Sequence, residues 1–184
     1  MRKLTLIFSS AFVIWSVGCG QNAGPPAKHP WSSFKVGSYV KMRMTSVMNV
    51  AGRQMNTTSE IKQTLVELTA TQAVVDLETT VMGKTTTTRK EYPLSVTDIS
   101  TSIPNLPSAS SVRGKKTGTE TLTVGGKSLS CKWTEASVTQ GAMNAATKFY
   151  WTEQIPGFIA KMITKTTGGA NSEITMEAVE FLAK

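Results

Sequence analysis

The chain has 184 residues, of which 40% are hydrophobic and 17% charged, and this length fits one ordinary domain of about 100–200 residues. A mean hydropathy of -0.10 and the moderate charge exclude a highly charged, disordered chain. After the N-terminus no apolar run approaches the ~18 residues of a membrane span, which excludes a polytopic membrane protein. Lysine and arginine outnumber the acids 20 to 12, but this excess is dispersed, so we expect no nucleic-acid partner.

The first residues have the layout of a secretory signal. Arg2 and Lys3 precede residues 4–17, which carry no charge and are too few to span a bilayer. The stretch ends in the letters SVGCG, with Cys19 as the cysteine. Small residues directly before a cysteine resemble the lipobox of bacterial lipoproteins, although Ser16 stands where that family more often has an aliphatic residue.

The resemblance implies that residues 1–18 are a signal peptide and that Cys19 becomes the acylated (palmitate-type) first residue of the mature protein. A glycine after the cysteine resembles lipoproteins sent to the outer membrane. We therefore expect a lipid-anchored protein of the bacterial cell envelope whose domain faces the periplasm, at the outer membrane rather than the inner one. The alternative is an ordinary signal peptide and a free Cys19 thiol, which would permit a disulfide with Cys131.

A short tether follows the cysteine. Residues 19–30 contain three prolines and two glycines and have no apolar pattern, so they predict a flexible linker. The only histidine, His29, lies in this linker, and we expect it to be exposed to solvent. The globular domain then comprises residues 31–184.

The sequence of this domain predicts β structure almost throughout. It contains 26 threonines, a β-branched residue that fits a pleated, half-exposed surface. Short turn signals such as Gly125-Gly126 and Ile155-Pro156-Gly157 separate segments of alternating polarity. The predicted strands comprise residues 40–44, 55–68, 75–81, 85–92, 119–124, 129–133, 147–153, 158–166 and 174–181. We expect an all-β fold: a single, strongly curved antiparallel sheet of about nine strands joined by meander hairpins, as a half-barrel or barrel.

Two segments lack this pattern of alternating strands and short turns. Residues 93–116 are rich in proline and serine and predict a long loop, either a crossover that covers the core or a ligand lid. Residues 138–146 are the one internal stretch that could hold a helical turn.

The chemistry-bearing residues do not form a catalytic pattern. A lone histidine in a linker cannot serve a Ser-His-Asp or Cys-His arrangement, and one histidine with one spare cysteine does not make a zinc site. Glu177 and Glu180 are expected on opposite faces of one strand, and Asp76 and Glu78 on one exposed face. No glycine-rich nucleotide motif is present. We therefore expect no catalytic, metal or cofactor site and no enzymatic activity.

The apolar residues give one positive indication. Eight methionines follow the signal, and methionine suits adaptable apolar surfaces. On a concave sheet they could line a groove for acyl chains or hydrophobic segments; the alternative is that they fill a loosely specified core. The candidate ligand or core face consists of Met42, Met44, Trp133, Phe149 and Trp151. Leu129, Cys131 and Trp133 share one strand face, and Cys131 is interpreted as a small buried hydrophobe.

The complete layout resembles small envelope lipoproteins with curved-sheet folds, some of which carry or chaperone lipidated proteins on the concave face. The aromatic strand Phe149-Tyr150-Trp151 and the turn that follows it also resemble uncharacterised periplasmic β-rich domains. We expect a non-catalytic binding module for a hydrophobic or envelope-component ligand, held at the membrane by its lipid. The alternative is a structural or assembly lipoprotein that engages another envelope protein through a sheet edge or residues 93–116, and an enzyme is the least favoured class.

Overall fold

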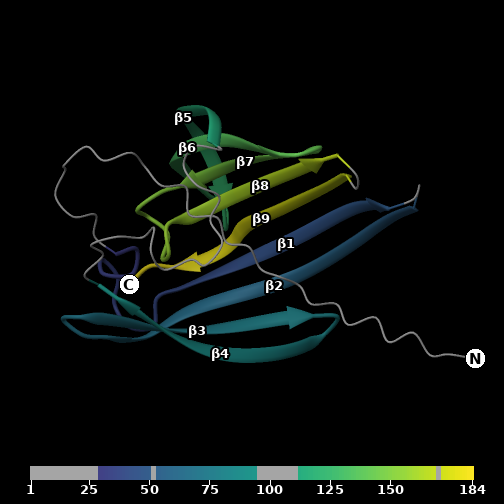
Figure 1. The fold of residues 1–184 in the computed structure, drawn as a ribbon. Helices are drawn as coiled ribbons and strands as arrows, with labels where there is room; N and C mark the ends of the chain where they lie inside the picture. Colours follow the sequence, from purple (N-terminus) through teal and green to yellow (C-terminus); the bar gives the residue numbers. More distant parts are fainter. Residues whose placement is uncertain (1–28, 51–52, 95–111, 169–170) are drawn as a thin grey trace, which may run out of the picture.

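A computed structural model describes residues 29–50, 53–94, 112–168 and 171–184, which form one antiparallel sheet of nine strands (Figure 1). The part of the chain so described contains no helix long and apolar enough to cross a membrane. The strands are β1 (Tyr39–Val50), β2 (Arg53–Leu68), β3 (Gln72–Val81), β4 (Lys84–Pro93), β5 (Val112–Val124), β6 (Lys127–Gln140), β7 (Met143–Trp151), β8 (Ile159–Thr167) and β9 (Asn171–Leu182).

The strand order is β4-β3-β2-β1-β9-β8-β7-β6-β5, so the first and last strands pair at the centre of the sheet. The sheet curls without closing, because β4 and β5 remain as its two edges (Figure 1). The predicted all-β meander is thereby confirmed, in its half-barrel form.

The turns explain most of the local structure. The hairpin at Gly125-Gly126 is confirmed, since both residues have positive φ angles, as a tight two-residue turn requires. The Ile155-Pro156-Gly157 turn is also confirmed: the Phe158 N–H donates to the Ile155 carbonyl at 2.8 Å, and Gly157 has a φ of 78°.

Two expectations about loops are corrected. Residues 138–146, which could have held a helical turn, form strands instead, because β6 continues to Gln140 and β7 begins at Met143. Gly141, with a φ of 59°, supplies the positive angle that this two-residue hairpin needs. Of the predicted loop, residues 93–116, residues 112–116 belong to β5 and Pro93 ends β4, whereas residues 95–111 lie outside the described residues.

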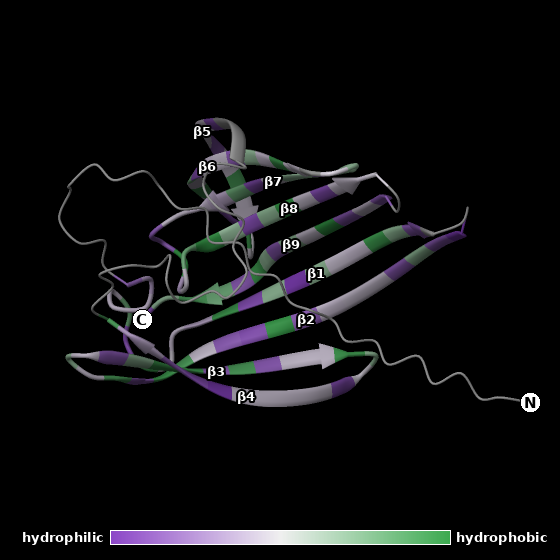
Figure 2. Ribbon diagram, in the orientation of Figure 1, coloured by the Kyte–Doolittle hydropathy of each residue, from purple (hydrophilic) through white to green (hydrophobic). Residues whose placement is uncertain are grey.

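The strand register sorts the side chains onto two faces. We call the face that carries Val40, Met42 and Met44 the inner face, and the face that carries Lys41 and Arg43 the outer face. Hydrophobic and hydrophilic bands accordingly alternate along β1 and β2 (Figure 2). All six ion pairs found among the described residues join outer-face side chains.

A bulge in β9 overturns one prediction about the acids. Lys41 pairs with Glu180 and Met42 with Ala178, so β9 has one extra residue at this point. Glu177 and Glu180 therefore lie on the same outer face, not on opposite faces as expected.

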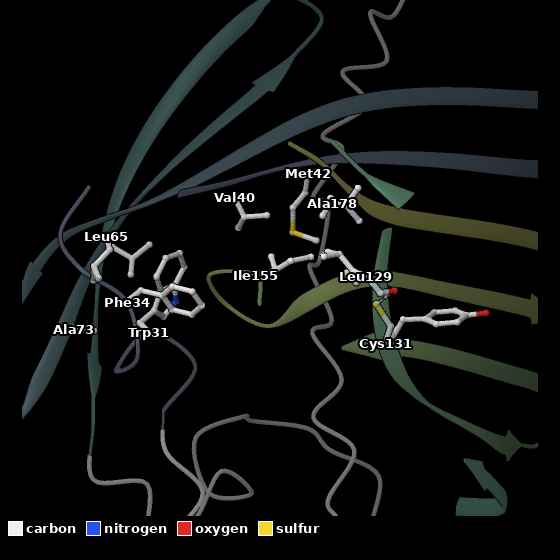
Figure 3. Packing of buried hydrophobic residues seen from close by; sticks show 14 residues of the cluster. Trp31, Phe34, Val40, Met42, Leu65, Ala73, Leu129, Cys131, Ile155 and Ala178 are labelled. Carbon is white, nitrogen blue, oxygen red and sulfur yellow. Dashed lines mark hydrogen bonds between the residues drawn. The ribbon is translucent and has the colours of Figure 1, made fainter. Parts of the chain in front are cut away.

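The hydrophobic core lies at one end of the curl, which we call the base. There Trp31 and Phe34 from the N-terminal segment, and Ile155 from the β7–β8 loop, belong to the same buried cluster as Val40 and Leu65 (Figure 3). At the opposite, open end the β1–β2, β3–β4, β6–β7 and β8–β9 hairpins turn, and the first six residues of β2 are exposed. The fold is thus closed at its base and thinly covered toward its hairpin turns.

His29 does not behave as the expected solvated linker residue. It is partly buried, its ring centre lies 5.4 Å from that of Tyr92, and its Nδ1 accepts from the Trp31 N–H at 3.4 Å. The Ser32 N–H also donates to the His29 carbonyl at 2.9 Å, which makes a turn. Trp31 is only 3% exposed, and its burial draws this turn and His29 onto the domain. Burial lowers the pKa of His29.

Candidate ligand-binding face

A row of apolar side chains crosses the inner face one step toward the open end from the core. Met44 pairs with Met176, Met176 with Met162, and Met162 with Phe149, so the row continues over β1, β9, β8 and β7. All four side chains are partly buried. Three inter-strand spacings of about 4.8 Å make this methionine row roughly 14 Å long.

The inner face around the row carries no charge. On the four strands of the row, the inner-face residues from the core toward the open end are all apolar or hydroxyl-bearing: Met42, Met44, Ser46 and Met48 of β1, Ser172, Ile174, Met176 and Ala178 of β9, Met162, Thr164 and Thr166 of β8, and Ala145, Thr147 and Phe149 of β7. One hydroxyl pair, Thr147 with Thr164, is satisfied internally at 3.1 Å. Such a face can accept apolar groups without desolvating an ion.

Ser59 on β2 stands at one end of the row. It pairs directly with Met44 on β1 and Val81 on β3, so its side chain is on the inner face. The residue is 4% exposed, and its hydroxyl has no hydrogen-bond partner. Buried polar atoms are almost always hydrogen-bonded in native structures, so this hydroxyl is a notable exception.

Four of the five predicted face residues share the inner face. Met42 is fully buried in the core, whereas Met44 and Phe149 lie in the methionine row. Trp151 is also on the inner face, nearer the base, with the Lys132 ammonium 4.8 Å from its ring centre.

Trp133, the fifth, lies on the outer face, because it pairs with Tyr150 while its neighbour Thr134 pairs with Phe149. Its ring covers Gly118 on β5, where an added Cβ would meet ring atoms at 2.6–2.8 Å. The Lys148 ammonium lies 4.3 Å from the centre of the same ring. Trp133 thus lies on the face of the sheet opposite the methionine row, and it packs against the buried cluster that contains Met42, Cys131 and Tyr150.

Lys148 joins this outer-face cluster electrostatically. Its hydrogen bond with Tyr150, together with the nearby Glu120 carboxylate, raises the pKa of Lys148. The Tyr150 hydroxyl in turn donates to Glu120 at 3.2 Å. These contacts connect β5, β6 and β7 on the outer face.

The outer face also has a shallow polar hollow of about 370 Å³ between β9 and β4. Lys41 pairs with Glu60 at 2.9 Å, and the Tyr39 hydroxyl donates to Glu180, which raises the pKa of Tyr39. The Lys62 ammonium lies over the Tyr39 ring. The hollow thus contains one ion pair, one tyrosine–carboxylate hydrogen bond and one cation–π contact, which connect β9, β1 and β2 on the outer face.

Cys131 is fully buried, as expected of a small hydrophobe. Burial raises the pKa of its thiol, which makes the reactive thiolate scarce at neutral pH. No group of three potential metal ligands occurs within the described ranges. Cys19, the predicted lipidation site, lies outside the described residues.

The sequence could indicate the methionines of the row but not Ser59. The alternation of apolar and polar residues and the many methionines indicate Met44 and Met162 as face residues. Ser59, in contrast, lies in a stretch of threonine and serine that looks uniformly polar. Its burial depends on the neighbouring strands β1 and β3, which no local pattern specifies.

Fold and site together define a curled, single-sheet β domain whose ion pairs lie on the outer face and whose inner face, on β1, β7, β8 and β9, is uncharged and lined by methionines. No protein-family model matches the chain, and no curated protein matches it in sequence.

Proposed function

We propose that the protein is a membrane-anchored envelope lipoprotein whose domain is a non-catalytic binding module for a hydrophobic ligand. Cys19 carries the lipid, and the inner face binds the ligand along the methionine row. The observation that carries this proposal is the charge asymmetry of the sheet, whose ion pairs are on the outer face while the inner face of the row strands is uncharged.

The packing of the row supports a ligand-binding role. Met44, Met162 and Phe149 are only partly buried, although the adjacent core residue Met42 is fully buried. Partly buried methionines can change rotamer at low cost, and their thioethers adapt to differently shaped apolar ligands. A flexible acyl chain requires this kind of surface.

The proposal can be tested in bacterial cells that produce the chain and are fed an alkyne fatty acid with a photoactivatable group. After irradiation, we expect crosslinked peptides from β1, β8 or β9, in addition to a light-independent acyl label on Cys19. Crosslinks spread evenly over both faces would contradict ligand binding on the inner face. Absence of the Cys19 label would contradict lipidation independently.

A matched pair of variants sharpens the test. Met44→Lys places a charge in the row, whereas Thr45→Lys places the same charge on the outer face of the same strand. Because burying an unpaired ammonium is costly, Met44→Lys should reduce inner-face crosslinking about tenfold or more, and Thr45→Lys should not. Equal yields from the two variants would refute the proposal.

The second candidate function is an assembly role, and one feature favours it. β4 is an edge strand with nine of its ten residues exposed, so its outer edge is accessible for strand pairing. Its basic residues Lys84, Arg89 and Lys90 are, however, the kind of side chains that block pairing at natural edges. Photocrosslinkers placed at Thr86 and at Met44 separate the two functions, because an assembly protein crosslinks to protein from Thr86 and a lipid-binding module to lipid from Met44.

A further inference from the structure

The buried hydroxyl of Ser59 assigns a polar recognition point to the inner face. It lies beside Met44, at the β2 end of the methionine row, and it is the one buried side-chain oxygen or nitrogen among the described residues that lacks a partner. A buried hydroxyl without a partner is unfavourable unless a ligand supplies one. Its neighbours on either side, Met44 and Val81, are apolar and cannot do so.

We propose that the inner face binds an uncharged acyl ester, with the ester carbonyl accepting a hydrogen bond from Ser59 and the acyl chain lying along the row. This inference rests on the proposed function and names the ligand class. Ser59 is one strand beyond Met44, so a carbonyl there places the chain directly over Met44, Met176, Met162 and Phe149.

The absence of charge on the row strands selects between ligand head groups. A free fatty acid carries a carboxylate, and the inner-face residues that pair with Ser59, Met44 and Val81, include no cation to pair with it. The next inner-face cation in this direction, Lys84, is an exposed residue of the edge strand β4, two strands from Ser59. An ionised carboxylate would therefore lose its hydration without compensation. An ester has a carbonyl of similar reach and no charge, so a single serine hydroxyl is sufficient to satisfy it.

The test uses the full-length chain, delipidated and held in an amphipathic polymer, and measures displacement of a fluorescent acyl probe. The competitors are a monoacylglycerol, the free fatty acid of the same chain length at pH 8, and an alkane. We expect the monoacylglycerol to displace the probe at lower concentration than the fatty acid. Ser59→Ala should weaken monoacylglycerol binding about two- to tenfold and leave alkane binding unchanged. The matched control is Ser46→Ala, an inner-face serine on β1 that is partly exposed, and it should change neither.

A stability readout distinguishes recognition from a structural role. Because the Ser59 hydroxyl has no partner in the ligand-free chain, Ser59→Ala should raise the melting temperature of the delipidated protein while lowering its ester affinity. If Ser59 had only a structural role, Ser59→Ala would lower both the melting temperature and the ester affinity. Either that result or an unchanged ester affinity overturns the inference. If the wild-type chain binds no acyl probe at all, the proposed function itself fails. If it binds every competitor equally well, only the role of Ser59 fails.

Discussion

Replacing Gly118 with alanine tests whether the Trp133 ring is held against β5 as tightly as the structure indicates. The new Cβ would lie 2.6, 2.7 and 2.8 Å from three atoms of the indole, whereas carbon atoms in contact prefer about 3.5–4.0 Å. The ring must therefore move by roughly 1 Å, and the Lys148 ammonium, 4.3 Å from its centre, stands close by.

The magnitude follows from two opposing effects. Overpacking of this kind costs about 1–3 kcal/mol of unfolding free energy. Gly118 has no positive φ, so alanine also restricts the unfolded chain and recovers about 0.4–1 kcal/mol. The net loss is about 1–2 kcal/mol, which lowers the melting temperature by roughly 2–8 °C in a domain of this size.

The assay is thermal unfolding of the full chain followed by circular dichroism, in the wild-type background and in Trp133→Leu. If the ring clash causes the loss, Gly118→Ala should cost nothing or stabilise the protein once the indole is absent. An equal loss of melting temperature in both backgrounds would refute this reasoning and assign the cost to the backbone at residue 118.

Three further predictions concern the base of the fold. Ile155 is fully buried, so in urea unfolding Ile155→Ala should lower the free energy of unfolding by about 2–5 kcal/mol and Ile155→Val by only about 0.5–1.5 kcal/mol. Equal losses for the two variants would mean that the β7–β8 loop collapses into the cavity left by the side chain. The Cys131 thiol should react with a thiol reagent only after denaturant is added, and rapid reaction of the native Cys19→Ala chain would contradict its burial. Because folding lowers the pKa of His29 below 6.5, the unfolded chain binds that proton more readily, so stability should fall as pH drops below 6.5. Nuclear magnetic resonance of this single histidine should give a pKa below 6.5, His29→Gln should reduce the pH dependence of the melting temperature, and a pKa at or above 6.5 would contradict the partial burial of the ring.

The strands could be predicted because their signal is local. Alternation of Met42 and Met44 with Lys41 and Arg43 already specifies which side chains share a face of β1. The glycine turns likewise specify where neighbouring strands reverse. What could not be predicted is how faces on different strands combine, because that depends on hairpin register. Trp133 and Phe149 both look like face residues, yet the two-residue turn after Gln140 places them on opposite sides.

The remaining misses arise from tertiary contacts. A one-residue bulge in β9, which no turn residue marks, moves Glu180 to the face of Glu177. His29 has the sequence context of a proline-rich linker, yet it is partly buried because the nearby Trp31 anchors the turn that contains it. Ser59 is hidden by strands that lie before and after it in the chain.

The placement of the ion pairs bears on function more than on stability. Exposed pairs such as Lys165 with Glu173 contribute little to folding, so their stabilising effect does not explain why all of them lie on one face. With the ion pairs on the outer face, the opposite face of β1, β7, β8 and β9 is free of charge, as the proposed binding of an apolar molecule requires. The fully buried residues at the base, such as Met42, Leu65 and Ile155, already supply a dry core. The methionine row can therefore remain loosely packed without loss of the fold, and that freedom is the property that a binding surface for acyl chains requires.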